Sequence, residues 1–263
     1  MRTSELSSPI RQYASYTWLL AQAELSRRYS GRLLGPLWAL VLPLLTVAVI
    51  WIALVYGLNM RDVAGGYSLD LVVGLMAWLF FADAVGNGVY ALTANPHLVK
   101  KVVFPVILVP VSYVLTSFLV HGLVAIIMCG AFAAFGQLSW TTLFTLPLWM
   151  LAYGVFTAAI VTLASALSVI VKDVREIVPA LLQILFWTTP IVWPVAVVSE
   201  RWAPLLLSSP LAVIVQGYRN ALLGSDFGLT FGHLVVFALF TLVITTAAIF
   251  IFNRLQPIFA EEL

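Results

Sequence analysis

Residues 36–57 read PLWALVLPLLTVAVIWIALVYG and carry no charged side chain. A helix needs about 20 mostly apolar residues to cross the hydrocarbon core of a bilayer, so this stretch predicts a membrane-spanning helix. The rest of the sequence agrees, because 62% of the 263 residues are hydrophobic and 9% are charged, whereas a soluble domain has roughly 25% charged residues. We therefore predict an all-α integral membrane protein with one domain, residues 1–263.

Five further spans are expected along the chain. We place them at residues 71–92, 108–135, 143–171, 177–198 and 231–252, which gives six transmembrane helices in all. Residues 203–219 contain an apolar stretch that is interrupted by prolines and is too short to span, so they predict a re-entrant hairpin between the fifth and sixth spans. Residues 10–32 mix aromatic and charged side chains and predict an amphipathic helix at the membrane interface.

The distribution of Lys and Arg predicts the orientation of the spans. Cytoplasmic segments of membrane proteins carry an excess of these residues. When the N-terminus is placed in the cytoplasm, only Arg61, Arg201 and Arg219 face the opposite side, and the remaining Lys and Arg residues lie inside. Both termini are therefore predicted to be cytoplasmic.

The sequence argues against several classes of chemistry. A phosphate-binding loop needs a lysine directly after a glycine, and none of the three lysines (Lys100, Lys101 and Lys172) follows one. The His residues have no Cys or acidic partner at the spacing of metal ligands, so we expect no metal site and no catalytic residue. The net charge of +2 gives no indication of a nucleic-acid partner.

Asp83 is the one acidic residue deep in a predicted span, and such a residue is a candidate functional residue. Asn87 follows one helical turn later, with Gly86 and Gly88 beside it, on a face suited to close helix packing. Two interpretations stay open: the pair forms part of a translocation path or proton site, or it makes a structural hydrogen bond between helices. His121 is expected to make an interhelical hydrogen bond.

Two short charged loops are predicted on the cytoplasmic side. Residues 95–105 read NPHLVKKVVFP, a cationic turn of helix between prolines, and residues 171–179 read VKDVREIVP. Most charged loops of membrane proteins are simply solvated. Two compact loops on one side are, however, also what a membrane domain needs to dock a soluble motor.

Short motifs occur in a specific order along nearly the whole chain. They are Arg27-Arg28-Tyr29, Leu34-Gly35-Pro36-Leu37-Trp38, Trp78-Leu79-Phe80-Phe81, Asn95 to Pro105, Lys172-Asp173-Val174-Arg175, Thr189-Pro190-Ile191, Ser209-Pro210-Leu211 and Tyr218-Arg219. In these motifs the sequence resembles the permease subunits of type-2 ABC exporters of surface polysaccharides, the family of O-antigen and teichoic acid exporters. The family usually has Asn-Pro where this chain has Ser209-Pro210, so a capping asparagine is absent there.

The resemblance implies a homodimer of this chain with two ATP-binding ABC subunits, in a bacterial inner membrane. ATP and Mg would be bound by those partners, so this chain is expected to bind no cofactor and to be a transport subunit rather than an enzyme. The cargo would be a surface glycan linked to polyprenyl diphosphate.

The resemblance also implies roles for particular residues. The residues expected to contact the ATPase are Asn95, Pro96, Lys100, Lys101 and Phe104, the coupling helix, together with Asp173 and Arg175 of the second loop. The glycan would cross at the dimer interface, and the candidates for the wall of its path are Trp78, Phe81, Asp83 and Asn87. For Trp78 and Phe81 the alternative is that the rings pack in the core or against lipid.

The resemblance further implies that the N-terminal amphipathic segment is a gate near the head group of the lipid. Arg27, Arg28 and Arg32, with Tyr29 at the interface, are expected to hold the diphosphate, because a guanidinium group matches phosphate oxygens in a bidentate manner. At helical spacing Arg28 and Arg32 would share one face and grip one diphosphate. The alternative is that these arginines only enforce the topology.

Two other classes of function remain open. A secondary transporter could be driven by protons through Asp83, with His121 as a second candidate. A membrane enzyme acting on polyprenyl phosphates would need acidic or basic residues clustered on one loop, whereas the acids here are dispersed. A neighbouring gene for an ATPase would favour the exporter.

Overall fold

The computed structural model describes residues 9–58, 67–100, 104–136, 138–193, 201–224 and 228–263, and every regular element within them is a helix. Five helical segments in this part of the chain are long and apolar enough to cross a membrane. They are built on α2 (Trp38–Trp51, preceded by a 3-10 turn at Gly35–Leu37 and extended by a π-helix at Ile52–Gly57), α3 (Tyr67–Gly88), α5 (Leu108–Ala134), α6 (Thr142–Ile170) and α10 (Phe231–Leu255). The other helices are α1 (Pro9–Tyr29), α4 (Pro96–Val99), α7 (Val174–Thr188), α8 (Ala203–Leu207), α9 (Pro210–Leu223) and α11 (Phe259–Glu262).

The prediction of an all-α protein with membrane-crossing helices is confirmed. The predicted spans 108–135, 143–171 and 231–252 coincide closely with α5, α6 and α10. The span predicted at 71–92 is shifted, because α3 begins and ends about one helical turn earlier.

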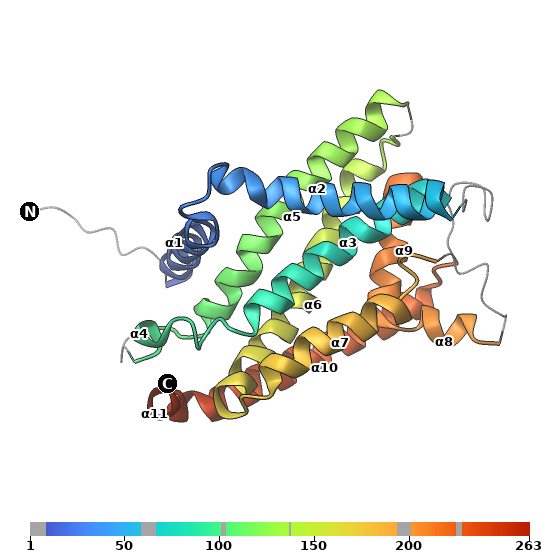
Figure 1. Cartoon of the computed structure of the whole chain (residues 1–263). Coiled ribbons are helices and arrows are strands. Elements are labelled where there is room, and N and C mark those ends of the chain that lie inside the picture. Colours follow the sequence, from blue (N-terminus) through green and yellow to red (C-terminus); the bar gives the residue numbers. More distant parts are fainter. Residues whose placement is uncertain (1–8, 59–66, 101–103, 137, 194–200, 225–227) are drawn as a thin grey trace, which may run out of the picture.

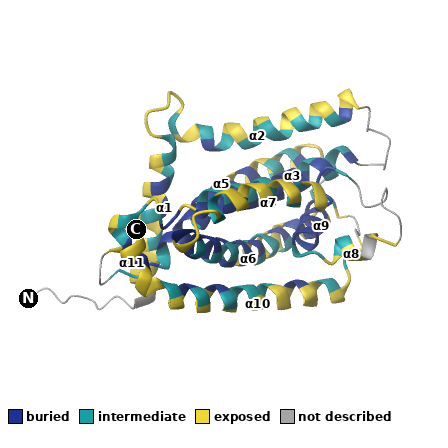
Figure 2. Cartoon of the chain, turned by 60° about the horizontal axis from the view of Figure 1, so that its bottom comes forward, coloured by how far each residue is buried: buried dark blue, intermediate teal, exposed yellow. Residues whose placement is uncertain are grey.

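The helices α3 and α6 form the centre of the molecule. In each of them 61% of an apolar 18-residue window is buried, against 17% in the segment around α2 and 11% in the segment around α10. Figure 2 shows the same division, with many exposed residues on α2 and α10, and also on α7. The central pair approaches closely at Gly88, where an added Cβ would lie 2.4 Å from Cγ1 of Val161. Apolar side chains on the outer helices suit a surrounding of lipid tails, which are as apolar as leucine.

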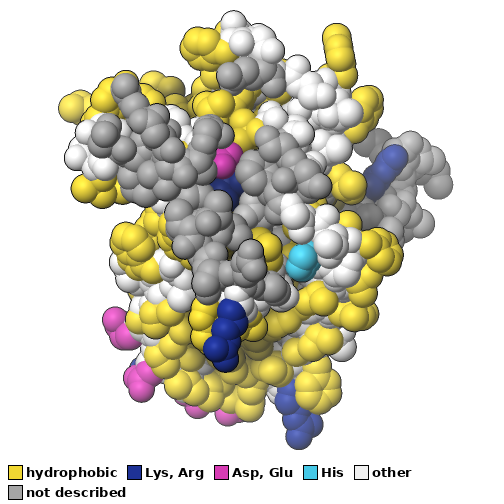
Figure 3. All heavy atoms as spheres, turned by 90° about the vertical axis from the view of Figure 1, so that its right-hand side faces the viewer, with side chains coloured by type: hydrophobic (Ala, Val, Ile, Leu, Met, Phe, Trp, Pro, Cys, Tyr) yellow, Lys and Arg dark blue, Asp and Glu magenta, His cyan; other side chains and the backbone are white. Residues whose placement is uncertain are grey.

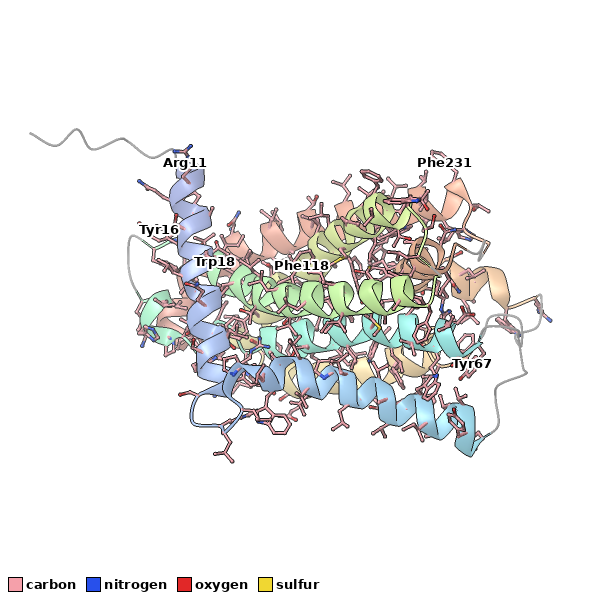
Figure 4. All side chains as sticks on the ribbon, turned by 90° about the horizontal axis from the view of Figure 1, so that it is seen from above. Arg11, Tyr16, Trp18, Tyr67, Phe118 and Phe231 are labelled. Atoms are coloured by element: carbon pink, nitrogen blue, oxygen red, sulfur yellow. The ribbon has the colours of Figure 1, made fainter. Side chains whose placement is uncertain are left out.

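The bundle has two distinct ends (Figure 1). We call one of them the α4 end, because α4 lies there with α1 and α11, and the other the α9 end, where α8 and α9 lie. Figure 4 shows α1, marked by Arg11, Tyr16 and Trp18, running across the direction of the long helices, while Tyr67 and Phe231 mark the opposite end. This crosswise arrangement is the one that a helix in a membrane interface adopts.

The span predicted at 177–198 differs from the structure. Continuous helix ends at Thr188, so α7 has 15 residues and is about 22 Å long, shorter than a hydrocarbon core of about 30 Å. The cause is Pro190, since the residue before a proline is driven out of the helical region. Thr189 accordingly has φ −85° and ψ 140°. Residues 194–198 of the predicted span lie outside the described part of the chain.

The hairpin predicted at 203–219 consists of two helices, α8 and α9, rather than one apolar stretch. Ser209 begins α9, and its Oγ accepts a hydrogen bond from the backbone N–H of Ala212 at 3.2 Å. A serine therefore performs the capping for which the resemblance implied an asparagine. The helix packs tightly on α6, because an added Cβ on Gly217 would lie 2.3 Å from the ring of Trp149.

The C-terminal residues return to α4. After α10 a 3-10 turn at Gln256–Ile258 leads into α11, where Phe259 is fully buried. Its ring packs edge-on against Phe252 with 5.4 Å between centroids. Both rings belong to one hydrophobic cluster with Val99 of α4 and Val109 of α5. The end of the chain is thus fixed to the α4 end.

Candidate functional site

The polar side chains at the α4 end are joined around Glu24 of α1. This side chain is only 6% exposed. Its Oε2 accepts hydrogen bonds from Nη2 of Arg27 at 2.6 Å and from Nε at 3.1 Å, while its Oε1 accepts one from Nε of Arg28 at 2.8 Å. A buried carboxylate needs such partners, because an unpaired buried charge is costly. Glu24 was not identified in the sequence analysis, because a single charged residue in an amphipathic segment is not distinguishable from one that is exposed to solvent.

Arg28 links α1 to α3. Its Nη1 donates to Oδ2 of Asp83 at 3.0 Å, and the hydroxyl of Ser117 on α5 donates to the same oxygen. The amide of Asn87 donates to Oδ1 and to the backbone carbonyl of Asp83, each at 2.8 Å. Asp83 therefore joins three helices, and it lies near the α4 end of α3 rather than deep in a span. This position favours the structural interpretation of the Asp83–Asn87 pair.

Arg27 connects α1 to α5 and, through Tyr113, to the residue before α4. Its Nη2 donates to the hydroxyl oxygen of Tyr113 on α5 at 2.6 Å. Asn95, the residue before α4, donates to the same oxygen at 3.1 Å and to the carbonyl of Ala91 at 2.8 Å. A continuous chain of hydrogen bonds thus runs from α4 through α1 to α3. We call it the Glu24 network, and its members are Glu24, Arg27, Arg28, Asp83, Asn87, Asn95, Tyr113 and Ser117.

The network keeps its arginines charged. The hydrogen bond to Glu24 raises the pKa of Arg27 above its ordinary value. Burial lowers the pKa of Arg28, but the charge of Asp83 and the hydrogen bond to Glu24 raise it by more. With two carboxylates and two guanidinium groups, the network is neutral as a whole.

Two cavities border the Glu24 network. One, of ≈ 220 Å³, lies between α1, α2, α3 and α5, and its polar lining includes Arg28, Tyr29 and Asp83, with mostly apolar side chains elsewhere. The other, of ≈ 160 Å³, lies between α1, α4 and α5, and its lining includes Glu24 and Arg27. Residues of α1 thus line both cavities.

The first charged loop contains the short turn of helix that was predicted. This turn is α4, and Lys101, which was expected to contact the ATPase, lies outside the described residues. Pro96 is the first residue of that turn, and Lys100 follows it with an exposed side chain. The half-buried Phe104 faces α1, with 6.4 Å between its ring centroid and that of Tyr16.

The second charged loop is bound to the same end of the molecule. Asp173 is the residue before α7 and is exposed. The Nη2 of Arg175 donates to the carbonyl of Ser168 at 2.9 Å, and the hydroxyl of Tyr90 donates to the carbonyl of Arg175 at 3.3 Å. Both charged loops are therefore presented together at the α4 end, as expected.

Trp78 and Phe81 were candidates for the wall of a translocation path or, alternatively, for packing in the core or against lipid, and their surroundings in this chain favour packing in the core. Trp78 is 7% exposed and Phe81 is 2% exposed. The Trp78 ring packs against Phe186 of α7, and the Phe81 ring stacks on Tyr153 and Phe156 of α6. Two large rings on the inner face of the central helix α3 fill the space between helices, so they are core residues.

Arg28 and Arg32 do not share a helix face. The helix α1 ends at Tyr29, and Gly31 adopts φ +74°, a left-handed conformation that ends a helix without strain in glycine. Arg32 is exposed and its guanidinium lies 5.5 Å from the ring centroid of Tyr29, whereas the Arg28 side chain is only 13% exposed. The two arginines therefore cannot grip one group from a common face in this arrangement.

The α9 end holds a buried arginine that sequence reasoning placed on the outward-facing side. Arg219 is 3% exposed. Its guanidinium donates to the carbonyl of Asp70 at 3.0 Å, to the carbonyl of Ile191 at 3.0 Å and to Oε1 of Gln216 at 3.4 Å. It thus fastens α9 to the start of α3 and to the segment after α7. The described surface of this end is mainly hydrophobic, with few charged side chains (Figure 3).

The remaining expectations concern histidine and metals. His121 makes the interhelical contact that was expected, with 2.9 Å between its Nε2 and the hydroxyl oxygen of Tyr218 on α9. Among the described residues, His, Cys, Asp and Glu form no group of three or more that could hold a metal ion.

Comparisons with known proteins identify similar sequences. The model of the family described as ABC-2 type transporter matches residues 15–223. Two proteins of Klebsiella pneumoniae named O-antigen export system permease protein RfbA are 26% and 28% identical to the chain, each over 93% of both sequences. A protein of the same name from Myxococcus xanthus is 30% identical over 79% of this chain and 80% of its own length. The region matched by the family model includes every member of the Glu24 network.

Proposed function

This chain belongs to the ABC-2 type transporter family, and on this premise we propose that it is the membrane subunit of an ATP-driven exporter of O-antigen polysaccharide. The observation that carries the proposal is the similarity to named O-antigen export permeases over 93% of the chain. The chain is a multi-pass membrane protein and a transport subunit, and ATP hydrolysis belongs to a separate ATP-binding partner.

We propose that the chain crosses the bilayer six times, with both termini in the cytoplasm. The start of α2 and the end of α10 both lie at the α4 end, so the number of crossings between them is even. Five long helices are an odd number, and α6 ends at the α4 end whereas α10 begins at the α9 end. The sixth crossing is therefore assigned to α7 with the chain that follows it, and α8 and α9 form the re-entrant hairpin.

We propose that two copies of the chain bind two ATP-binding subunits through the α4 end. Both charged loops lie at this end, and the exposed Lys100 and Asp173 are available for contact. Arg175 is held by Ser168 and Tyr90, so it supports the loop as well as contributing charge. ATP and Mg belong to the partner subunits.

The proposed cargo is an O-antigen chain on polyprenyl diphosphate that approaches α1. Arg27 has a side chain that is 56% exposed, and Arg32 is exposed. Guanidinium groups at an interface suit phosphate oxygens. Arg28, by contrast, is already paired with Glu24 and Asp83, so we assign it to holding α1 rather than to the cargo.

The alternative functions are not favoured. A proton-driven transporter was proposed to use Asp83, but the oxygens of Asp83 accept hydrogen bonds from Arg28, Ser117 and Asn87 and so join α3 to α1 and α5. A membrane enzyme would need a cluster of acids, and the family is one of transport subunits.

The proposal is tested in cells that lack the gene for this chain. Lipid-linked O-antigen polysaccharide should accumulate on the cytoplasmic side, and the wild-type gene should restore it to the surface. The affinity-purified wild-type chain should carry an ATP-binding subunit with it. Normal surface O-antigen in the deletion strain, or purification without any ATP-binding subunit, would overturn the proposal.

A further inference from the structure

The Glu24 network connects α4, the proposed contact with the ATP-binding subunit, to α3 inside the bundle. We propose that Glu24 is a positioning residue that transmits a displacement of α4 to the contact between α1 and α3. The inference rests on the proposed function, because it takes α4 as the point at which the ATP-binding subunit acts. It adds to that function the route by which α1 responds to the motor.

The first step of the route runs from α4 to α1. Asn95 is continuous with α4, and its amide reaches the hydroxyl of Tyr113, which also accepts a hydrogen bond from Arg27. Tyr113 is 3% exposed, so water does not compete well for these bonds. A movement of α4 relative to α5 must therefore shift or break the bond between Asn95 and Tyr113, and so change the surroundings of the oxygen to which Arg27 donates.

The second step passes through Glu24. Arg27 and Arg28 are neighbours in sequence, but one reaches toward α4 and the other toward α3. Each bonds a different oxygen of the same buried carboxylate, at 2.6 Å and 2.8 Å. Charge-assisted bonds of this kind are stronger than neutral ones and fix the planar guanidinium groups in orientation. Without Glu24 the two arginines would be free to move independently.

The third step ends at α3. The bond of 3.0 Å between Arg28 and Asp83 holds α1 against the polar end of the ≈ 220 Å³ cavity. Nη2 of Arg28 is buried and has no hydrogen-bond partner among the described residues. An unpaired buried donor is unfavourable, so the observed arrangement does not satisfy Arg28 fully and a second arrangement of α1 need not be much less stable.

The experiment uses the complete transporter, purified with its ATP-binding subunit and reconstituted in liposomes. ATP hydrolysis is measured without cargo and with lipid-linked O-antigen polysaccharide extracted from cells that lack this chain. The variants are Glu24→Gln, Tyr113→Phe, Asp83→Asn and the double variant Tyr113→Phe with Asp83→Asn. Tyr13→Phe is the matched control for Tyr113→Phe, because it also removes a hydroxyl. Tyr13 is an exposed residue of α1, the helix that contains Glu24, and it lies outside the network.

We expect Glu24→Gln and Tyr113→Phe each to lower the stimulation by cargo about tenfold, the size of effect of one lost charged hydrogen bond. Because Tyr113→Phe and Asp83→Asn interrupt one route, the double variant should be no worse than the more severe single variant. Two independent structural effects would instead multiply. Tyr13→Phe should respond as the wild type does.

Multiplied effects in the double variant, or wild-type stimulation in Glu24→Gln, would overturn the inference. If the wild-type complex itself shows neither export nor stimulation, the proposed function fails instead, so the two failures are distinguishable. Assembly is checked by recovery of the ATP-binding subunit with each variant. Where Glu24→Gln fails to assemble, Tyr113→Phe decides the matter, since it removes a single oxygen atom.

Discussion

Adjacent residues of one helix have different roles here. The side chain of Arg27 is 56% exposed and that of Arg28 is 13% exposed, although both bond the same carboxylate. The difference arises because neighbouring residues of a helix point in different directions. Arg27 points toward the outside of the molecule, and Arg28 points toward the interior of the bundle. Arg27 therefore remains available to a ligand, whereas Arg28 holds α1 to α3.

Export should depend on the guanidinium groups of Arg27 and Arg32 rather than on their charge alone. The double variant Arg27→Lys with Arg32→Lys retains the charges, and hence the topology, but loses the bidentate fork that suits phosphate. We expect it to insert at the wild-type level and to export about tenfold less O-antigen, in line with one or two lost charge-assisted bonds. Surface O-antigen and the amount of membrane-inserted protein are the two measurements.

The control for this pair is Arg254→Lys, an exposed arginine in the last turn of α10 that has no proposed contact with cargo. It should export as the wild type does. Wild-type export by the double variant would leave topology as the only role of Arg27 and Arg32.

Sequence reasoning at the residue scale succeeded where the signal was local and failed where it was not. His121 in an apolar span predicted an interhelical bond, which Tyr218 provides. The partners of Arg28 and Arg219 could not be predicted, because Asp83, Asp70 and Ile191 are distant in sequence and the contacts depend on how whole helices cross. The sequence accordingly placed Arg219 on the outward-facing side of the membrane without indicating that its side chain is buried.

At the scale of helices, prediction depended on the length of the apolar runs. The long charge-free runs predicted α5, α6 and α10 nearly to their ends. The run at 177–198 contains Pro190, and its hydropathy alone could not show that the helix stops at Thr188. The re-entrant hairpin predicted at 203–219 stays a prediction, and the division of these residues into α8 and α9 depends on the cap at Ser209.

Packing between helices should be sensitive at Gly217. An added Cβ there would lie 2.3 to 2.5 Å from three atoms of the Trp149 ring, closer than real contacts allow. Gly217→Ala should therefore force α9 away from α6 and destabilise the protein by about 1–3 kcal/mol. Thermal unfolding of the purified protein in detergent should show a lower midpoint than for the wild type.

Gly122→Ala is the matched control for this change. Gly122 is also a helical glycine, in α5, but an added Cβ there meets nothing within 4 Å. Alanine is favoured over glycine in a helix by about 0.5–1 kcal/mol, so this variant should be at least as stable as the wild type. Equal midpoints for the two variants would refute the packing argument.

The whole molecule has an apolar body with polar contacts concentrated at its two ends. At the α4 end the Glu24 network joins α1, α3 and α5. At the α9 end Arg219 joins α9, α3 and the segment after α7. Interactions of this kind are expected at the ends of a membrane domain, because buried charges are least costly near the interfaces. Each end is therefore held by a few polar contacts, whereas the central pair α3 and α6 is held by apolar packing.

The number of membrane crossings determines on which side of the membrane each loop lies, and cysteine labelling can establish that number. In a variant in which Cys129, the one cysteine of the sequence, is replaced by serine, single cysteines are placed at Lys100, Lys172, Trp202 and Glu261. If α7 and the chain after it make a sixth crossing, a membrane-impermeant thiol reagent should label only Trp202→Cys in intact cells. The other three should react only after the membrane is opened, because the positive-inside rule places them in the cytoplasm.

Five crossings would put Trp202 and Lys172 on one side and Glu261 on the other. Labelling of Glu261→Cys but not Trp202→Cys from outside would therefore refute the six-crossing topology.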